Sequence, residues 1–597
     1  MKNAFVIVTL SGLLSACAVA PPPAPAPLVQ AETVADAAGP ELAAEQAARQ
    51  AADELASLPK NELTRELLYS LMQAELEFRS GAWQGPYDTL MRLATQTRDP
   101  RLARRAAEMA RTARQESQTF AAVRLWRQLA PASDEAAGFY LALVLQSGDP
   151  AEAEALIRER LARPDPAARV LAMYESSQYL ARMGDKAAAA AMLERLLTPY
   201  QSSWEARVLL AQNALARNDA AGALVHAQAA LAIKPDSELA ALVLAQVAPD
   251  PDAVAALFTR FLASYPQAGE VRAAYGRLLV SRKQYAEGRK EFATLLAQKP
   301  DNPGALYALG YVSTQLNDAT GAEQYFTRFI EAFEKNPTDE REPGRVLLIL
   351  AQLAEARQDL PAARQWLEKI TDSQSDAWFS AQLKLAQLTA REGNVVGARA
   401  MLAVVKASEP AQQAQLIQAE AGILRDAGQA GAAYAMLAEG IVAHPLNPDL
   451  HYDFALMAEK MGQLDRMEAS LRTVIEQAPD NHHAYNALGY SLADRNERLP
   501  EALALIAKAL QMAPGDPFIM DSMGWVYYRM GKLNEAEAHL RRAYALRSDV
   551  DIAVHLGEVL WQKGQKADAQ KLLREARARD PRNDTLRSTL ARLQLSL

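Results

Sequence analysis

Histidines are the side chains best able to hold a metal ion in this chain, and it has seven: His226, His444, His451, His482, His483, His539 and His555. None lies in a His-Glu-x-x-His motif, which would place two imidazoles on one helix face. Adjacent His482 and His483 would point about 100° apart on a helix, which makes a poor chelate. His555 and Glu558 would lie one turn apart, but a di-iron bundle needs a second such pair and two more glutamates. We therefore expect no metal and no cofactor.

The chain also lacks the patterns that position a nucleophile or a phosphate group. It has no Gly-x-Ser-x-Gly elbow, no glycine-rich phosphate loop and no dinucleotide-binding fingerprint. An enzyme would need a domain outside the repeats described below, and no segment is left over to hold one. We expect no catalytic residue and no enzymatic activity.

The only cysteine, Cys17, lies between an apolar run and a proline tract. Residues 1–16 have the pattern of an export signal, in which Lys2 provides the positive start and AFVIVTLSGLL the short apolar stretch. One interpretation is an ordinary secretory signal that is cleaved after a small residue, with Cys17 incidental to it.

A second interpretation comes from the tetrapeptide LSAC, which ends at Cys17 and resembles the bacterial lipobox. The resemblance implies cleavage before Cys17 and attachment of a thioether-linked diacylglycerol, usually with a further acyl chain such as palmitate. Two or three acyl chains anchor a protein firmly, whereas one holds it only marginally. Ala18 follows, where lipoproteins kept in the inner membrane typically have aspartate. By this resemblance the protein is lipid-anchored in the outer membrane and faces the periplasm.

The segment after Cys17 cannot pack a core. PPPAPAP favours a stiff polyproline II spacer, and an alanine-rich stretch continues to about residue 40. PELAAEQAARQAADELASL then predicts a helix with Pro40 near its start.

Helices are the elements that must position the remaining side chains. Half of the residues are hydrophobic but only 7% are aromatic, and much of the apolar content is alanine, the best helix former. The net charge of −8 is spread over mixed charges, which excludes a basic footprint for nucleic acid. No apolar run reaches the roughly 20 residues of a membrane-spanning helix. We predict an all-α fold.

A small residue recurs at nearly constant spacing through the second half of the chain. The steps are 33 to 35 residues, except for one of 41 that contains the polar insertion 336–344. An alanine, a large apolar residue and another alanine follow at fixed offsets, as in Gly524, Ala536, Leu540 and Ala543. The recurring positions are Gly276, Gly310, Ala351, Ala386, Ala421, Ala455, Gly489, Gly524 and Gly557. The pattern resembles the tetratricopeptide repeat, in which two helices pack as a hairpin.

The pattern has a physical basis. Small residues let the two helices of a repeat touch, glycines such as Gly462 and Gly531 permit left-handed backbone between them, and prolines such as Pro479 and Pro514 stop the second helix. We predict a tetratricopeptide-repeat solenoid, a superhelix of about a dozen helical hairpins with a long concave face, after a signal peptide and a disordered linker. The predicted divisions are the signal peptide 1–16, the lipidated cysteine with linker and leading helix 17–60, irregular helical repeats 61–270 and regular repeats 271–597.

One stripe of each first helix should line the concave face. In the last repeats this stripe holds aromatic and charged residues: Tyr490, Asp494, Asp521, Trp525, Tyr528, Arg529, Glu558 and Trp561. Exposed aromatics beside arginine are typical of a partner-binding hot spot, so Tyr490, Trp525 and Trp561 are predicted to form an exposed aromatic ladder. The alternative is that these aromatics pack between helices, or that Trp561 shields the end of the solenoid.

Several longer phrases are similar to one family. LLYSLMQAELEFRSG, TRDPRLARRAAEMA, GYSLADRNERLPEALALIAKAL, DSMGWVYYRMG and HLGEVLW, with the lipobox and the Pro/Ala spacer, resemble the tetratricopeptide outer-membrane lipoproteins of Gram-negative bacteria. That family includes the adaptor of a periplasmic C-terminal processing protease in pseudomonads. The resemblance implies a scaffold that binds and activates the serine protease and presents peptidoglycan hydrolases to it. Because one repeat fold serves many clients, an alternative is an assembly factor for an envelope secretion, pilus or exopolysaccharide export machine.

Overall fold

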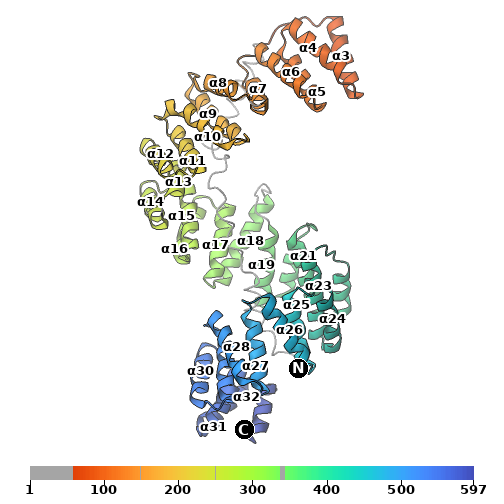
Figure 1. Ribbon diagram of the computed structural model, residues 1–597, viewed down its shortest axis with the longest axis vertical. Coiled ribbons are helices and arrows are strands. Elements are labelled where there is room, and N and C mark those ends of the chain that lie inside the picture. Colours follow the sequence, from red (N-terminus) through yellow and green to blue (C-terminus); the bar gives the residue numbers. More distant parts are fainter. Residues whose placement is uncertain (1–57, 148, 249, 336–342, 597) are drawn as a thin grey trace. The chain divides into compact units, whose positions relative to one another are not determined.

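The computed structural model describes residues 58–147, 149–248, 250–335 and 343–596. Within these ranges all regular structure is helical, with thirty-one α-helices, α3 to α33, and one short 3-10 helix, η2 (Thr198–Tyr200) (Figure 1). The predicted all-α fold is confirmed. No helix in these ranges combines the length and the apolar content needed to cross a bilayer. The predicted signal peptide, Cys17 and the linker lie outside the described residues, as does most of the insertion 336–344.

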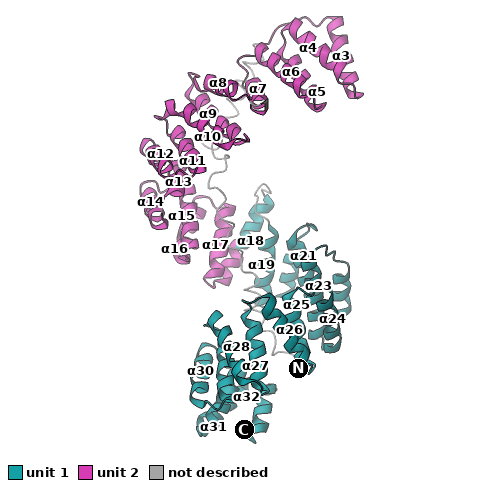
Figure 2. Ribbon diagram, in the orientation of Figure 1, with its two compact units in different colours: residues 1–18, 326–597 teal, residues 19–325 magenta. Residues whose placement is uncertain are grey.

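The described residues form two compact units, 58–325 and 326–596, called here the N-terminal and C-terminal units (Figure 2). The N-terminal unit contains α3 (Arg65–Arg79), α4 (Gln84–Thr97), α5 (Pro100–Thr112), α6 (Glu116–Leu129), α7 (Asp134–Ser147), α8 (Pro150–Leu161), α9 (Pro166–Ala181), α10 (Lys186–Leu197), α11 (Trp204–Ala216), α12 (Ala220–Ile233), α13 (Glu238–Val247), α14 (Pro251–Ser264), α15 (Gly269–Ser281), α16 (Tyr285–Gln298) and α17 (Pro303–Gln315). Helix α18 (Ala319–Lys335) crosses the boundary. The division predicted at residue 270 concerns repeat regularity and stays a prediction.

The C-terminal unit continues with α19 (Pro343–Ala356), α20 (Leu360–Glu368), α21 (Asp376–Arg391), α22 (Val395–Ala403), α23 (Pro410–Asp426), α24 (Ala430–Ala443), α25 (Pro448–Lys460), α26 (Leu464–Gln477), α27 (His482–Asp494), α28 (Leu499–Met512), α29 (Pro517–Arg529), α30 (Leu533–Leu546), α31 (Val550–Gln562), α32 (Lys566–Arg579) and α33 (Asp584–Leu593).

In the C-terminal unit the described helices pair as α19 with α20 through α31 with α32, and α33 follows. The predicted array of helical hairpins is confirmed. Consecutive helices contact each other from α3 to α17 and from α19 to α33. Each hairpin therefore packs mainly on its neighbours, as in a repeat array.

The starts of the first helices follow from their caps. Asn447 before α25 and Asp516 before α29 each accept a hydrogen bond from a backbone N–H of the first turn. A proline follows each cap, at a position whose N–H would have no partner inside the helix. These caps fix where the helix that carries Trp525 begins.

The recurring small residue is required by close contact inside the hairpin. A Cβ atom on Gly524 would lie 2.5 Å from Leu540 Cγ and 3.1 Å from the carbonyl oxygen of Ala536. At Gly489 and Gly557 the nearest side-chain atom of the second helix would lie at 2.6 and 2.9 Å. These distances are shorter than a carbon–carbon contact, so the helices could not pack this closely around a larger residue.

The predicted turn and stop signals are confirmed. Gly462 and Gly531 have φ values of 70° and 77° in the turns between paired helices. Helices α26 and α28 each end two residues before a proline, Pro479 and Pro514. The residue before a proline is driven away from helical backbone, and this terminates the second helix.

Candidate partner-binding surface in the C-terminal repeats

Four helices carry the predicted partner-binding stripe and the residues that contact it. Helices α27, α29 and α31 are the first helices of three successive hairpins, and α33 comes after them. Each contacts the next in this series. Side chains about one repeat apart in sequence therefore meet between neighbouring first helices.

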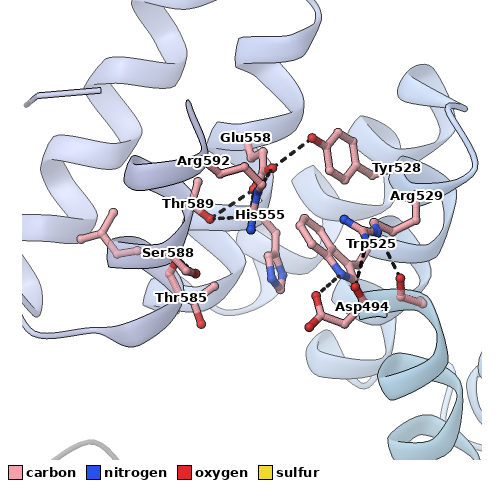
Figure 3. A network of polar contacts seen from close by, with 12 residues as sticks. Asp494, Trp525, Tyr528, Arg529, His555, Glu558, Thr585, Ser588, Thr589 and Arg592 are labelled. Carbon is pink, nitrogen blue, oxygen red and sulfur yellow. Dashed lines mark hydrogen bonds and ion pairs between the residues drawn. The ribbon is translucent and has the colours of Figure 1, made fainter. Parts of the chain in front are cut away.

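Trp525, on α29, lies at the centre of this region and is only 2% exposed. Its indole Nε1 donates a hydrogen bond to Asp494 Oδ1 of α27 at 3.2 Å (Figure 3). Its ring stacks on the His555 imidazole of α31, with 4.2 Å between centroids and 25° between planes. Tyr528 lies against it as well, at 5.0 Å. Trp525 thus joins three successive first helices.

His555 and Asp521 form a buried pair between α29 and α31. The imidazole Nδ1 lies 2.9 Å from Asp521 Oδ2, and both residues are buried. Burial alone would lower the pKa of His555, but the Asp521 carboxylate, together with Asp551 and Glu558, raises that pKa above its ordinary value. The pair holds a charge inside the repeat array, where a lone charge would be costly.

Glu558 is the second buried charge and is 1% exposed. Its carboxylate accepts hydrogen bonds from Tyr528 Oη at 3.0 Å and from Thr589 Oγ1 at 3.1 Å. The guanidinium of Arg592 donates to both carboxylate oxygens, at 2.8 and 2.6 Å (Figure 3). Burial, followed by the charge of Glu558, raises the pKa of Tyr528 to about 12. Hydrogen bonds to Glu558 of α31 therefore link this helix to both α29 and α33.

Arg529 binds the end of α27 from the neighbouring helix. It donates from Nε to the carbonyl of Ala493 at 3.1 Å and from Nη2 to the carbonyl of Asp494 at 2.8 Å. A cation at a helix C-terminus donates hydrogen bonds to carbonyls that have no partner inside the helix. Its positive charge also interacts favourably with the negative end of the helix dipole. Its guanidinium also lies 5.8 Å from the Trp525 ring centroid.

The predicted exposed aromatic ladder is wrong at Trp525 and incomplete elsewhere. Trp525 is buried, and Tyr490 and Trp561 are half-buried. Asp521 and Glu558 are buried too, whereas Asp494 is exposed and Tyr528 and Arg529 are half-buried. The reason is that Trp525 and Glu558 lie between neighbouring helices of this series and contact side chains of the next one, His555 for Trp525 and Thr589 and Arg592 for Glu558. The alternative that these aromatics pack between helices describes Trp525.

Sequence reasoning missed Thr589 and Arg592, the residues of α33 that hold Glu558. No repeat signature marks them, because α33 lies beyond the last hairpin with the full pattern. It also considered His555 as a metal ligand, whereas Asp521 is its partner. That contact had a signal, since the two residues are 34 apart, one repeat length. Among the described residues, no three or more His, Cys, Asp or Glu side chains gather to hold a metal ion.

A comparison with protein-family profiles agrees with this array of helical hairpins. A profile of the tetratricopeptide repeat family matches residues 174–238, 250–303, 276–337, 452–517 and 522–594. These matches lie in both units and include α27, α31, α33 and most of α29. The chain is a tetratricopeptide repeat protein.

Two curated relatives were found for this tetratricopeptide repeat protein. A repeat-containing protein of Pseudomonas aeruginosa is 40% identical over 209 residues, 35% of each chain. Cellulose synthase operon protein C of Xanthomonas axonopodis pv. citri is 25% identical over 349 residues, 56% of this chain and 22% of that protein. The chain thus spans about a third and about a fifth of the relatives it matches. Among solved structures, a thermophilic tetratricopeptide repeat protein of Thermus thermophilus is similar to 30% of this chain. The similarity covers all of the Thermus protein, at 23% identity and a TM-score of 0.28.

One tetratricopeptide position differs in character along the C-terminal unit. The residue after the recurring small one is Leu456 in α25, Tyr490 in α27, Trp525 in α29 and Glu558 in α31. Leu456 is 40% exposed, whereas Trp525 and Glu558 are buried between first helices. The accessible part of the stripe therefore lies toward α25 and α27.

Proposed function

We propose that this tetratricopeptide repeat protein is a scaffold anchored through lipid on Cys17 in the outer membrane and facing the periplasm. It binds and activates a C-terminal processing serine protease and presents peptidoglycan hydrolases to it. The observation that carries the scaffold role is the array of tetratricopeptide hairpins, a fold that offers extended surfaces to protein partners. The lipobox and the longer phrases similar to the lipoprotein family support the anchor and the choice of partner.

The proposed partner surface is the stripe of first helices from α25 to α29, where polar and apolar side chains remain accessible. Leu456 and Asp494 are exposed, and Tyr490, Tyr528 and Arg529 are half-buried. Their neighbours Trp525 and Asp521 fix the backbone beneath them. A rigid surface loses less entropy when a partner binds.

The test of the partner is an affinity capture of the lipidated protein from detergent-solubilised envelopes, followed by mass spectrometry. The proposal predicts a processing protease among the strongest hits. Purified protease should then cleave a peptidoglycan hydrolase faster with the scaffold than without it. Capture without any protease would contradict the proposal.

The test of the surface compares two exposed apolar residues of the C-terminal unit. Leu456→Asp places a charge on the proposed surface and should weaken capture of the protease at least tenfold. Val442→Asp is the matched control, because Val442 is 79% exposed on α24, a second helix. It should leave capture unchanged. Equal effects of the two variants on protease capture would show that the partner does not bind at Leu456.

A second candidate function is assembly of an envelope export machine. The observation that favours it is the match of 56% of this chain to part of cellulose synthase operon protein C. This hypothesis predicts capture of an outer-membrane channel or exporter subunit without a protease. It also predicts that deleting the scaffold leaves hydrolase levels unchanged.

A further inference from the structure

The first helices of the C-terminal unit carry four carboxylates that form no ion pair in the described part of the chain. Three of them accept hydrogen bonds from neutral groups alone, and the fourth, Glu459, accepts none. We call these four residues the acidic face: Asp453 and Glu459 of α25, Asp494 of α27 and Asp551 of α31. The donors are Gln418 Nε2 to Asp453 at 2.7 Å, Trp525 Nε1 to Asp494 at 3.2 Å and Asn583 Nδ2 to Asp551 at 3.1 Å.

Half-buried carboxylates on the second helices of the same unit do have cation partners. Glu468 of α26 forms an ion pair with Arg472 at 2.8 Å, and Glu537 of α30 forms one with Lys563 at 2.6 Å. Asp453 is half-buried as well, yet its hydrogen-bond partner is an amide. The acidic face therefore lacks the positive charge that comparable carboxylates of the unit have.

The missing charge raises the pKa of both carboxylates on α25. Burial raises the pKa of Asp453, and Arg425, which lies beyond ion-pair distance, does not outweigh it. Glu459 is exposed, but the helices around it desolvate its carboxylate enough to raise its pKa, and the charge of Asp494 raises it further. A positive charge between Glu459 and Asp494 would relieve this repulsion.

Tyr490 of α27 lies where the carboxylates converge. Burial raises the pKa of its hydroxyl, and the charges of Asp521, Asp494, Asp551 and Glu459 raise it further. Four successive first helices, α25 to α31, therefore place negative charge near one hydroxyl. Within the described residues this hydroxyl has no hydrogen-bond partner, so it remains available to a bound group.

Leu456 adds an apolar contact between two of the carboxylates. Asp453, Leu456 and Glu459 are three residues apart and so lie along one side of α25. Leu456 is 40% exposed. The order acidic, apolar, acidic fits a segment in which basic and apolar residues alternate. Lysine and arginine suit such a surface, because their apolar stems can lie on an aromatic ring while their charged ends reach a carboxylate.

A metal ion does not fit the acidic face. No three His, Cys, Asp or Glu side chains in the described ranges are close enough together to hold one. The four carboxylates are instead distributed over α25, α27 and α31, which suits an extended chain that carries positive charge at several points. Complementary charge distributed in this way gives an interface its specificity.

We propose that the acidic face binds an extended basic segment of the scaffold's protein partner. One lysine or arginine of that segment lies between Glu459 and Asp494, beside the Tyr490 hydroxyl. This inference rests on the scaffold role in the proposed function and adds the chemistry of the segment that binds.

Binding of a model peptide to the purified full chain tests the proposal. The probe is a fluorescein-labelled decapeptide of alternating lysine and alanine, and its affinity is measured by fluorescence anisotropy. Glu459→Gln with Asp494→Asn should weaken binding at least tenfold, and the amide oxygen at position 494 can still accept the hydrogen bond from Trp525. The matched control is Glu439→Gln with Glu476→Gln, which removes two exposed charges from the second helices α24 and α26. It should leave the affinity within twofold of wild type.

Three outcomes would overturn the proposal. Equal weakening by the two double variants would mean that net charge alone attracts the peptide. Equal affinity for a decapeptide of alternating glutamate and alanine would mean that the face does not select positive charge. Glu459→Gln alone should weaken binding at least threefold, and unchanged affinity would be the third such outcome. This single variant leaves the fold intact, because the Glu459 side chain is exposed and makes no hydrogen bond.

Capture from envelopes separates this inference from the proposed function. If wild type captures the processing protease and the variant Glu459→Gln with Asp494→Asn captures it equally well, the inference is wrong and the proposed function stands. If wild type captures no protease but binds the lysine peptide through these two residues, the proposed function is wrong and the acidic face serves another protein.

Discussion

At the scale of single residues, Trp525 shows how a side chain typical of binding sites can serve packing. Its indole is buried among Asp494, Tyr528, Arg529 and His555, which come from three helices. Aromatic rings contribute both buried area and specific ring contacts, and here both are used inside the protein. The half-buried residues beside it are also fixed by hydrogen bonds, Tyr528 to Glu558 and Arg529 to the carbonyls of Ala493 and Asp494.

We expect Trp525→Ala to lower the free energy of unfolding by about 3–5 kcal/mol, because it removes a large buried ring and leaves a cavity. Trp525→Phe keeps most of the ring contacts and loses the hydrogen bond to Asp494, so it should cost about 1 kcal/mol. Urea unfolding followed by circular dichroism measures both. A stable Trp525→Ala protein that no longer captures its partner would instead assign Trp525 to binding.

The buried His555–Asp521 pair predicts a pH dependence. The pKa of His555 is raised in the folded protein by Asp521, and also by Asp551 and Glu558. A raised pKa means that the pair stabilises the fold fully below the unfolded value of about 6.5, and that this contribution is lost as the pH rises through the folded value. Asp521→Asn should remove it. The difference in urea midpoint between wild type and Asp521→Asn should shrink from pH 6 to pH 9.

A pH-independent difference would mean that Asp521 acts through hydrogen bonding alone.

The identities of the stripe residues could be predicted from sequence, but their exposure could not. The repeat period places Asp494, Trp525 and Glu558 on first helices, and this placement is confirmed. Whether a first-helix residue faces solvent or the next first helix depends on the rotation of each hairpin against its neighbour. That rotation follows from side-chain packing and has no periodic signal in the sequence.

At the scale of helices, the recurring small residue predicts opposite effects for two glycines. Gly524→Ala should destabilise by about 1–3 kcal/mol, because its Cβ would overlap Leu540 and the Ala536 carbonyl. Gly422→Ala is the matched control inside α23, where a Cβ would meet nothing within 4 Å. It should stabilise by about 0.5–1 kcal/mol, since alanine favours helix more than glycine. Thermal melting of the two variants should move in opposite directions.

Helix α33 contacts the buried Glu558 carboxylate through Arg592. We therefore expect strong energetic coupling between Arg592 and Glu558 in the free energy of unfolding. Arg592→Ala leaves the Glu558 carboxylate with only neutral donors, and Glu558→Gln removes the charge that needs compensation. Arg592→Ala should cost about 1–3 kcal/mol in the wild-type background and much less beside Glu558→Gln. A double-mutant cycle by urea unfolding measures the coupling. Additive effects would show that Arg592 contributes nothing to the burial of Glu558.

Some helix boundaries could be predicted because local signals determine them. The caps Asn447 and Asp516 stand directly before α25 and α29, and α26 and α28 end two residues before a proline. In the N-terminal third the small residue and the alanines depart from the repeat pattern, so the bounds of individual repeats could not be predicted there.

At the scale of the whole molecule, the proposed function makes the site of action depend on lipid at Cys17. On the proposed function, Cys17→Ser should move the protein from the membrane fraction to the soluble periplasmic fraction and abolish labelling by palmitate. Ala18→Asp should keep the label but shift the protein to the inner membrane. Membrane fractionation measures both. A Cys17→Ser protein that stays membrane-bound would favour an ordinary secretory signal and another means of attachment.

The contacts between consecutive helices have a consequence for how the chain acquires its structure. Because neighbours in space are neighbours in sequence, few long loops must close before a contact forms, and proteins with such local contacts fold quickly. A hairpin can form as soon as its two helices are available, and each new hairpin then adds to a surface that already exists. The chain can therefore fold in the order in which it is synthesised. A damaged repeat would halt the growth of structure at that point and leave the preceding repeats intact.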